Sequence, residues 1–439
     1  MAEEAEVFVE KLVAGGYALG QLPGGMKVLI RGGYPEEFVR IRLTQKKKDI
    51  AFGEVVQIIS KSPLRVKPVC KHFGDCGGCQ WQDYSYQEQL KWKKAIIEEQ
   101  LKRVGHMEIS VEEVIPSPKR FHYRNIMEMT FSGKNLGFKR WKDSRVVDIH
   151  ECYLVPGRFV EIAREIKSIL EFLEIPVYNW KSGKGILKHV VIRGSTTTGE
   201  TMAMVVTKTE TLPKANLMKR LFIEKYPDVY LVHVMNSRDA VALRGPYRVL
   251  SGEGVITEEM DWFSFQIPPT AFFQVNTDVA RLLANHVFEE LMPSKSDRVL
   301  DLYSGVGFFA INVAPHVERC VGVESSRVAV KAARANANIN RLKNVEFVNA
   351  GVEDFEVERG AFNKVILDPP RQGLSKEVHE MILKLEPERI IYVSCDTASL
   401  ARDLKNLTDN GYAVEKVSAF DMFPQTHHVE SVATLVKAL

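Results

Sequence analysis

An apolar run meets a glycine-rich turn at Val299-Leu300-Asp301-Leu302-Tyr303-Ser304-Gly305-Val306-Gly307. Beyond this stretch, short apolar runs recur at 321–323, 345–348, 365–367 and 390–393, with helical patterns between them. Regular alternation of this kind predicts parallel strands joined by helices in a doubly wound sheet. The stretch therefore predicts an α/β, Rossmann-like domain over residues 263–439.

The turn itself predicts a nucleoside cofactor. Gly305-Val306-Gly307-Phe308-Phe309-Ala310 follows the pattern Gly-x-Gly-x-x-Gly/Ala, whose glycines permit close backbone approach. Glu324, at the end of the next strand, could accept hydrogen bonds from ribose hydroxyls. Asp301 disfavours a pyrophosphate and favours the ammonium and sulfonium groups of S-adenosylmethionine. We expect S-adenosylmethionine in preference to NAD, and the alternative is a glycine turn without a ligand.

Two further strands end in reactive side chains. Cys395 directly follows the run 390–393, and Asp368 begins Asp368-Pro369-Pro370-Arg371 after the run 365–367. Ligands bind at the carboxyl edge of such sheets, and a helix beginning near Thr397 would favour a thiolate at Cys395. The simpler alternatives are a cysteine of the core and a rigid proline turn.

Glu430 supplies a candidate base. A thiolate that adds to C6 of a pyrimidine makes C5 nucleophilic, and C5 can then accept a methyl group. A base must remove the C5 proton before the thiol leaves, and a partly buried carboxylate suits this step. In isolation Glu430 would be interpreted as a solvated carboxylate at the end of a strand.

Four early cysteines indicate a metal site. Cys70, Cys76 and Cys79 are spaced Cys-x5-Cys-x2-Cys, and 72 residues separate Cys79 from Cys152. In a cytoplasmic protein such a cluster favours metal over disulfides. The chemistry leaves zinc and an iron–sulfur cluster equally open. The sixth cysteine, Cys320, is expected to be buried.

The front half of the chain predicts two other units. Residues 1–62 alternate short strands with glycine turns, as in a small β-barrel, and seven basic residues lie between Lys27 and Lys48 against two acids. These cations suit a groove that follows a nucleic-acid backbone, or form a solvated hairpin tip. Residues 63–262 predict an α+β domain with a helix over 86–104 and strands near 125–131, 189–193, 203–206 and 229–233.

The amino-acid composition is typical of a soluble globular protein. The 439 residues are 45% hydrophobic and 26% charged, with a net charge of +3. Residues 61–145 hold 17 Lys or Arg against 10 acids, whereas residues 263–439 hold 19 against 23, so nucleic acid is expected at the front half. The acidic start, Met1-Ala2-Glu3-Glu4, and the lack of a long apolar run predict a cytoplasmic protein without membrane contact.

The motifs together resemble the RumA/TrmA family of S-adenosylmethionine-dependent RNA uracil-C5 methyltransferases. The resemblance rests on four ordered segments: Asp301 to Gly307, Asp368 to Arg371, Ser394-Cys395-Asp396 with Leu400 to Leu404, and Phe423 to Glu430. It implies Cys395 as the nucleophile and Glu430 as the proton acceptor. It also implies that S-adenosylmethionine is contacted by Gln274, Tyr303, Glu324 and Asp368.

The resemblance implies further properties of the front half. The four cysteines would hold a [4Fe-4S] cluster with a structural or RNA-organising role, and residues 1–62 resemble a TRAM domain, an RNA-binding barrel. The substrate would be a uridine in structured RNA, with 23S ribosomal RNA favoured over transfer RNA. A monomer without an obligate protein partner is expected.

Two rival functions stay open. An RNA cytosine-C5 methyltransferase would use the same addition chemistry, but its group commonly has a second cysteine in the Asp-x-Pro loop, where this chain has none. A non-catalytic, metal-bearing RNA-binding factor would not need Cys395 and Glu430.

Overall fold

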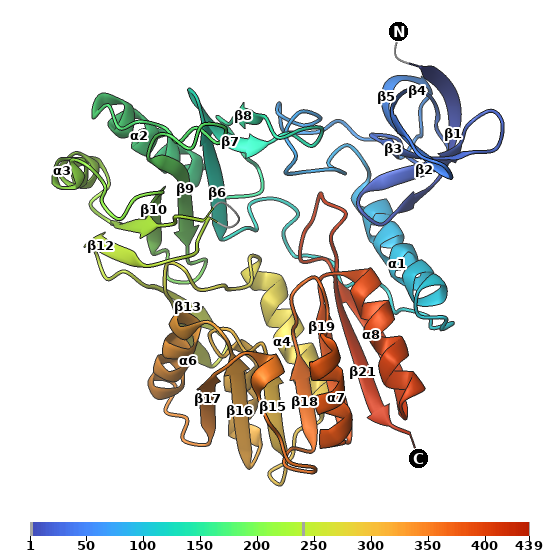
Figure 1. Ribbon diagram of the computed structural model, residues 1–439, viewed down its shortest axis with the longest axis vertical. Coiled ribbons are helices and arrows are strands. Elements are labelled where there is room, and N and C mark those ends of the chain that lie inside the picture. Colours follow the sequence, from blue (N-terminus) through green and yellow to red (C-terminus); the bar gives the residue numbers. More distant parts are fainter. Residues whose placement is uncertain (1–2, 239–241, 439) are drawn as a thin grey trace.

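The computed structural model describes residues 3–238 and 242–438, so Met1 and Ala2 of the acidic start lie outside it. Three β assemblies follow one another along the chain, and Figure 1 shows a barrel, a central sheet flanked by helices, and a carboxyl-terminal sheet. Among the described residues, no helix combines the length and apolar character needed to cross a membrane.

The first assembly is a closed barrel in the strand order β1-β2-β3-β5-β4, which confirms the predicted small barrel. Alternate residues point inward, for example Val7 and Val9 of the first strand and Val28 and Ile30 of the third, all at most 1% exposed. Its strands are β1 (Glu4–Val13), β2 (Tyr17–Gln21), β3 (Lys27–Arg31), β4 (Phe38–Lys46) and β5 (Ile50–Ser60).

Helix α1 (Tyr86–Arg103) connects the barrel to the carboxyl-terminal domain. Ser85 caps it by accepting a hydrogen bond from the amide of Glu88. One side of α1 contributes Ile96 to the barrel core, and another contributes Ile97 and Leu101 to the core of the last domain. The helix therefore fixes the position of the barrel over that domain (Figure 1).

The central assembly is a seven-stranded sheet in the order β12-β11-β10-β9-β6-β7-β8. Its helices are α2 (Gly157–Phe172), whose apolar face joins the sheet core, and α3 (Ala215–Lys225). The four predicted strands are present as β6, β9, β10 and β11, and the helix predicted over 86–104 is α1, with boundaries shifted by a few residues. The strands are β6 (Ile126–Ser132), β7 (Asn135–Lys139), β8 (Val146–Asp148), β9 (Leu187–Gly194), β10 (Thr201–Thr207), β11 (Val229–Met235) and β12 (Tyr247–Ser251).

The carboxyl-terminal sheet has the order β17-β16-β15-β18-β19-β21-β20, with a hairpin, β13 and β14, before it. The first five strands in this order are parallel, and β21 is antiparallel to both neighbours. The predicted doubly wound fold is confirmed. Its strands are β13 (Ile256–Met260), β14 (Phe263–Ile267), β15 (Arg298–Leu302), β16 (Arg319–Glu324), β17 (Val345–Asn349), β18 (Lys364–Leu367), β19 (Arg389–Ser394), β20 (Tyr412–Phe420) and β21 (Glu430–Lys437).

Helices cover both faces of this sheet. The helices are α4 (Thr277–Leu291), α5 (Phe308–Val313), α6 (Arg327–Ile339), α7 (Lys376–Leu385) and α8 (Thr397–Asp409). Residues of α4, α5 and α6 belong to one apolar core, and residues of α7 and α8 belong to a second core on the other face. Strand order reverses between β16-β15 and β18-β19, which places a ligand site at the carboxyl ends of β15 and β18.

Candidate active site

The glycine turn lies at this switch point, between β15 and α5. Tyr303 has φ +65°, a left-handed conformation that is strained for a residue with a side chain, and such strain gathers at functional sites. Gly307, with φ +87°, begins α5, and a Cβ atom there would lie 2.7 Å from the ring of Phe347. The Glu324 carboxylate, at the end of β16, accepts a 3.2 Å hydrogen bond from the amide of Gly305. Glu324 and the turn are therefore adjacent, as predicted.

Asp301 lies in β15, just before the turn. Its side chain is fully buried, and one oxygen accepts a 3.0 Å hydrogen bond from the amide of Ala310 in α5. Burial raises the pKa of Asp301 well above its ordinary value. Asp301 therefore lies buried beneath the turn, where it holds the start of α5, and its expected preference for S-adenosylmethionine over a pyrophosphate stays a prediction.

Gln274 is held on the segment 268–277 by the central domain. Arg193 of β9 donates 2.9 Å hydrogen bonds to the carbonyls of Pro268 and Ala271. Asn125 donates a 2.8 Å hydrogen bond to the carbonyl of Gln274 itself. These partners are buried, so the segment has one defined path beside the switch point.

The backbone register brings Cys395 and Glu430 to the same edge. Ser394, the last residue of β19, pairs with Ser431 of the antiparallel β21. One step outward are Cys395 on one strand and Glu430 on the other. Asp368 follows β18, the other neighbour of β19, so the three reactive side chains meet at adjacent strand ends.

The charges of these neighbouring groups influence one another. Burial raises the pKa of Cys395 to about 11, the charges of Glu430 and Asp368 add to the rise, and Arg371 opposes it. Burial, followed by the charge of Asp368, raises the pKa of Glu430 well above its ordinary value. Burial likewise raises the pKa of Asp368. The three acids therefore compete for negative charge, and Arg371 is the cation that favours the ionised thiol.

A buried carboxylate, Asp403 of α8, fixes the loop that carries Asp368 and Arg371. It accepts a 2.8 Å hydrogen bond from the amide of Leu374 and a 2.7 Å bond from the hydroxyl of Tyr392 in β19. Burial alone would raise the pKa of Asp403, but donated hydrogen bonds, including one from His379, hold it below its ordinary value. Asp403 thereby joins β18, β19 and α8 behind the reactive groups.

The loop before Glu430 is anchored to α1. Lys93 forms a fully buried ion pair with Asp421 at 2.5 Å, and its ammonium also donates to the carbonyl of Phe423. Gln425 has φ +68° and accepts a 3.1 Å side-chain hydrogen bond from Gln89. The base at the start of β21 therefore depends on a helix more than 300 positions away in the sequence.

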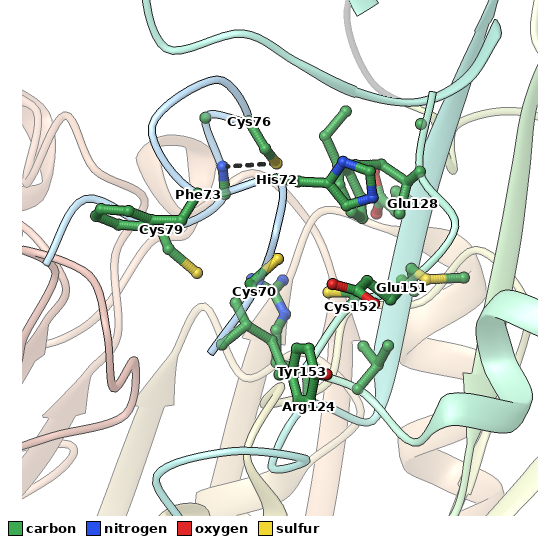
Figure 2. A pocket seen from close by; sticks show the side chains of 18 of the residues that line it. Cys70, His72, Phe73, Cys76, Cys79, Arg124, Glu128, Glu151, Cys152 and Tyr153 are labelled. Carbon is green, nitrogen blue, oxygen red and sulfur yellow. Dashed lines mark hydrogen bonds between the residues drawn. The ribbon is translucent and has the colours of Figure 1, made fainter. Parts of the chain in front are cut away.

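The four early cysteines line one cavity of about 400 Å³, formed by the segment 70–82, β6, β7 and the segment 149–155 (Figure 2). Burial raises the pKa of Cys76 to about 12 and also raises the pKa values of Cys70, Cys79 and Cys152. The predicted convergence of these four residues is therefore present.

A metal at this cavity is not shown. Within residues 3–238 and 242–438, no group of three or more His, Cys, Asp or Glu side chains is arranged to hold a metal ion. The donor set nevertheless suits a soft metal, because four half-buried thiols surround a space more than ten times the ~30 Å³ of one water molecule. Cys320 is fully buried in β16, as predicted.

Several positioning residues escaped sequence reasoning. Arg193, Asn125 and Lys93 each act across a large sequence separation, so no local pattern marks them. Asp403 stands within a recognised motif, but its role depends on a contact with the loop after β18.

These features are typical of an S-adenosylmethionine-dependent methyltransferase: a glycine loop at the switch point, Glu324 at the end of β16, and Cys395, Glu430 and Asp368 at adjacent strand ends. Residues 255–438 match the family model described as tRNA (Uracil-5-)-methyltransferase. An uncharacterized RNA methyltransferase of Thermotoga maritima is 47% identical over 434 residues, which cover 98% of this chain and 99% of that protein. The chain belongs to the RumA/TrmA-like family of RNA methyltransferases.

Other comparisons agree with this assignment. An uncharacterized RNA methyltransferase of Aquifex aeolicus is 34% identical over 430 residues, 97% of each protein. The crystal structure of the Pyrococcus abyssi tRNA (uracil-54, C5)-methyltransferase in complex with S-adenosyl-L-homocysteine is 32% identical with a TM-score of 0.80. It covers 98% of this chain and 99% of its own, so the similarity includes all three assemblies.

Proposed function

We propose that the protein methylates C5 of a uridine in structured RNA through a covalent adduct between Cys395 and C6 of the base. The observation that carries the proposal is the meeting of Cys395, Glu430 and Asp368 at one sheet edge beside the glycine turn. The target base would leave its stack to enter this edge.

The chain's own residues account for each bond and proton. The thiolate of Cys395, favoured by Arg371, forms a bond to C6, and the ring's electron pair becomes available at C5. S-adenosylmethionine, when bound, supplies the methyl group that C5 accepts. Glu430 then takes the C5 proton, the C6–S bond breaks, and the thiolate leaves. The raised pKa of Glu430 makes it a stronger base than an ordinary carboxylate.

The remaining site residues bind and orient. We assign Tyr303 and Glu324 to the cofactor because they lie at the glycine turn, and Gln274 because its neighbour Phe273 packs on Phe308 at the start of α5, with ring centres 5.8 Å apart. Asp368 would contact both the cofactor and the target base, since its loop is rigid and Asp403 holds it from behind.

We propose a [4Fe-4S] cluster at Cys70, Cys76, Cys79 and Cys152. The cavity volume supports a polynuclear cluster, whereas a single zinc would draw four sulfurs to about 2.3 Å from one point. The cluster would stabilise the segment 70–82, which lies far from the methyl transfer in sequence but contacts the loop before Glu430. Iron and sulfide analysis of protein purified without oxygen tests this assignment.

The wider properties follow the same assignment. We propose a cytoplasmic monomer with domain limits near residue 62, after the barrel, and near residue 262, in the turn of the β13–β14 hairpin. We favour large-subunit ribosomal RNA as the substrate, because the barrel occurs together with the four cysteines. Transfer RNA is the second candidate, and the Pyrococcus abyssi enzyme's substrate favours it.

The test uses matched cysteine variants. Cys395→Ala should abolish methylation, whereas Cys320→Ala, which changes a buried core cysteine, should retain it. Mass analysis of nucleosides should detect 5-methyluridine, and 5-methylcytidine would instead establish the cytosine rival. Methylation by Cys395→Ala would exclude the covalent mechanism. Mapping 5-methyluridine in ribosomal and transfer RNA from a strain lacking the protein decides between the two substrates.

A further inference from the structure

The basic residues of the barrel divide into two sets. Four of the seven between Lys27 and Lys48 form ion pairs with acids of the first strand or its start, at 2.8 to 3.8 Å: Lys27 with Glu10, Arg40 with Glu6, Arg42 with Glu4 and Lys46 with Glu3. In the described part of the chain, no acid pairs with the other three, Arg31, Lys47 and Lys48. The predicted groove along all seven cations is therefore largely neutralised, and positive charge stays available at Arg31, Lys47 and Lys48, of which the first two lie over aromatic rings.

These two cations lie over aromatic rings on the outer face of β2, β3 and β5. The Arg31 guanidinium lies 5.6 Å from the ring centre of Tyr17 and 5.8 Å from that of Trp141. Lys47 lies 5.4 Å from the ring centre of Phe52, and the rings of Tyr17 and Phe52 are 6.1 Å apart. We name Tyr17, Arg31, Lys47, Phe52 and Trp141 the Tyr17–Trp141 face. None of its members is buried.

The cysteine segment places Trp141 on this face. Gly77 donates a 2.9 Å hydrogen bond to the carbonyl of Lys139, and Cys76 forms a β-bridge with Arg140. Lys142, the next residue after Trp141, forms a 2.9 Å ion pair with Glu54 of β5. Two assemblies therefore build one surface.

The Tyr17–Trp141 face continues into the active-site loop. Gly16, next to Tyr17, packs so closely on His427 that a Cβ atom would lie 2.7 Å from its ring. The rings of His427 and His428 are 4.0 Å apart, and Glu430 follows two residues later. Burial lowers the pKa values of His427 to about 4 and His428 to about 3, so both rings are neutral and can stack. Figure 1 shows this loop, in red, rising from the carboxyl-terminal domain before β21.

We propose that the Tyr17–Trp141 face binds unpaired RNA nucleotides that flank the target uridine, with bases on the aromatic rings and phosphates at Arg31 and Lys47. Aromatic rings interleaved with unpaired cations suit single-stranded RNA, because every base has a face that can stack and every nucleotide carries a phosphate. A duplex hides the faces of its bases and would not use the rings. The proposal rests on the proposed function, because it takes RNA as the substrate and deepens how that RNA is held.

The experiment measures binding of a twelve-nucleotide oligouridine and of a twelve-base-pair RNA duplex to the full chain. Tyr17→Ala and Trp141→Ala should each weaken oligouridine binding roughly tenfold, whereas Tyr17→Phe should stay within about twofold of the wild type. Trp262→Ala, which removes a ring that is 91% exposed elsewhere, should have no effect. Tyr17→Phe also controls for folding, since it keeps the ring.

Salt dependence provides the second readout. Arg31→Gln should reduce the slope of log affinity against log salt by about 0.7, the value for one phosphate contact on a single strand. The matched variant Arg40→Gln, whose cation already pairs with Glu6, should leave the slope unchanged.

The outcomes separate the two proposals. If Tyr17→Ala and Trp141→Ala bind oligouridine as tightly as the wild type, or if duplex binding falls equally, the face does not stack unpaired bases and this inference is overturned. Wild-type production of 5-methyluridine would then leave the proposed function intact. If oligouridine binding depends on Tyr17 but no RNA is methylated, the face stands and the proposed function fails.

Discussion

Replacing Arg193 should loosen the cofactor segment without touching the cofactor itself. Arg193 is 4% exposed, and its guanidinium donates hydrogen bonds of 2.9 Å to the carbonyls of Pro268 and Ala271. Burial lowers its pKa to about 10, so it stays charged at neutral pH. In Arg193→Met the buried carbonyl of Ala271 loses this donor, at about 1–3 kcal/mol, whereas that of Pro268 still accepts from the amide of Ala271 and loses about 0.5–1.5 kcal/mol. The segment 268–277 would thus lose about 1.5–4.5 kcal/mol of the free energy that holds it.

Cofactor binding should report this loss. S-adenosylhomocysteine would have to reorder the segment that carries Gln274, so its dissociation constant should rise at least tenfold, since tenfold corresponds to about 1.4 kcal/mol. Arg193→Lys keeps a charge near Glu128 but presents a single ammonium to two carbonyls, so its effect should be intermediate. Titration calorimetry measures the binding, and amide hydrogen exchange measures the order of 268–277.

A surface arginine provides the control. Arg281 is half exposed and lies 3.7 Å from Asp261 in the same domain, and such pairs contribute about 0–1 kcal/mol. Arg281→Met should therefore bind S-adenosylhomocysteine within about twofold of the wild type. If Arg193→Met also binds within twofold and its segment 268–277 exchanges no faster, the reasoning from buried carbonyls is refuted.

Three other changes test the site. Glu430→Gln should trap RNA on Cys395 as an adduct that survives denaturing electrophoresis. Burial raises the pKa of Glu430 in the folded protein, so the wild type loses stability as pH rises from about 4.5 through that pKa. Glu430→Gln should therefore have a higher melting temperature than the wild type at pH 8.5 but not at pH 4. Melting temperatures equal to those of the wild type at both pH values would contradict the burial argument. Lys93→Met should destabilise the protein by about 3–5 kcal/mol because Asp421 stays buried without its partner, and adding Asp421→Asn should recover much of the melting temperature; no recovery would mean that the pair is not the cause. Gly16→Ala should cost more than about 1 kcal/mol, because φ is +78° and the methyl group meets His427, and faster amide exchange over 423–430 would confirm that the barrel holds this loop; unchanged exchange would deny it.

Local sequence pattern was sufficient to predict the helices and strands and most of the reactive residues at the edge of the carboxyl-terminal sheet. Cys395 and Asp368 each follow a short apolar run, and parallel strands must place their carboxyl ends at one edge. Fold class, the cofactor turn, Cys395 and Asp368 could thus be predicted from local pattern, whereas Glu430 was predicted from the reaction's need for a base and from the family resemblance. The same reasoning could not tell that Asp301 is buried beneath the turn, because the sequence does not say on which side of the loop a strand-end carboxylate lies.

Tertiary structure decided what depends on pairing between distant segments. Glu430 reaches Cys395 because β21 runs antiparallel beside β19 in one register, and a shift of one residue would turn it to the other face. Arg193 and Lys93 act through contacts across 75 or more positions, and the acids of β1 neutralise cations that looked free in the sequence. Sequence alone determined which chemical groups the chain carries and which strand ends present them, because those follow from local periodicity. Only the folded chain determined their neighbours, and with them their charges and their fixed positions, because long-range packing has no local signature.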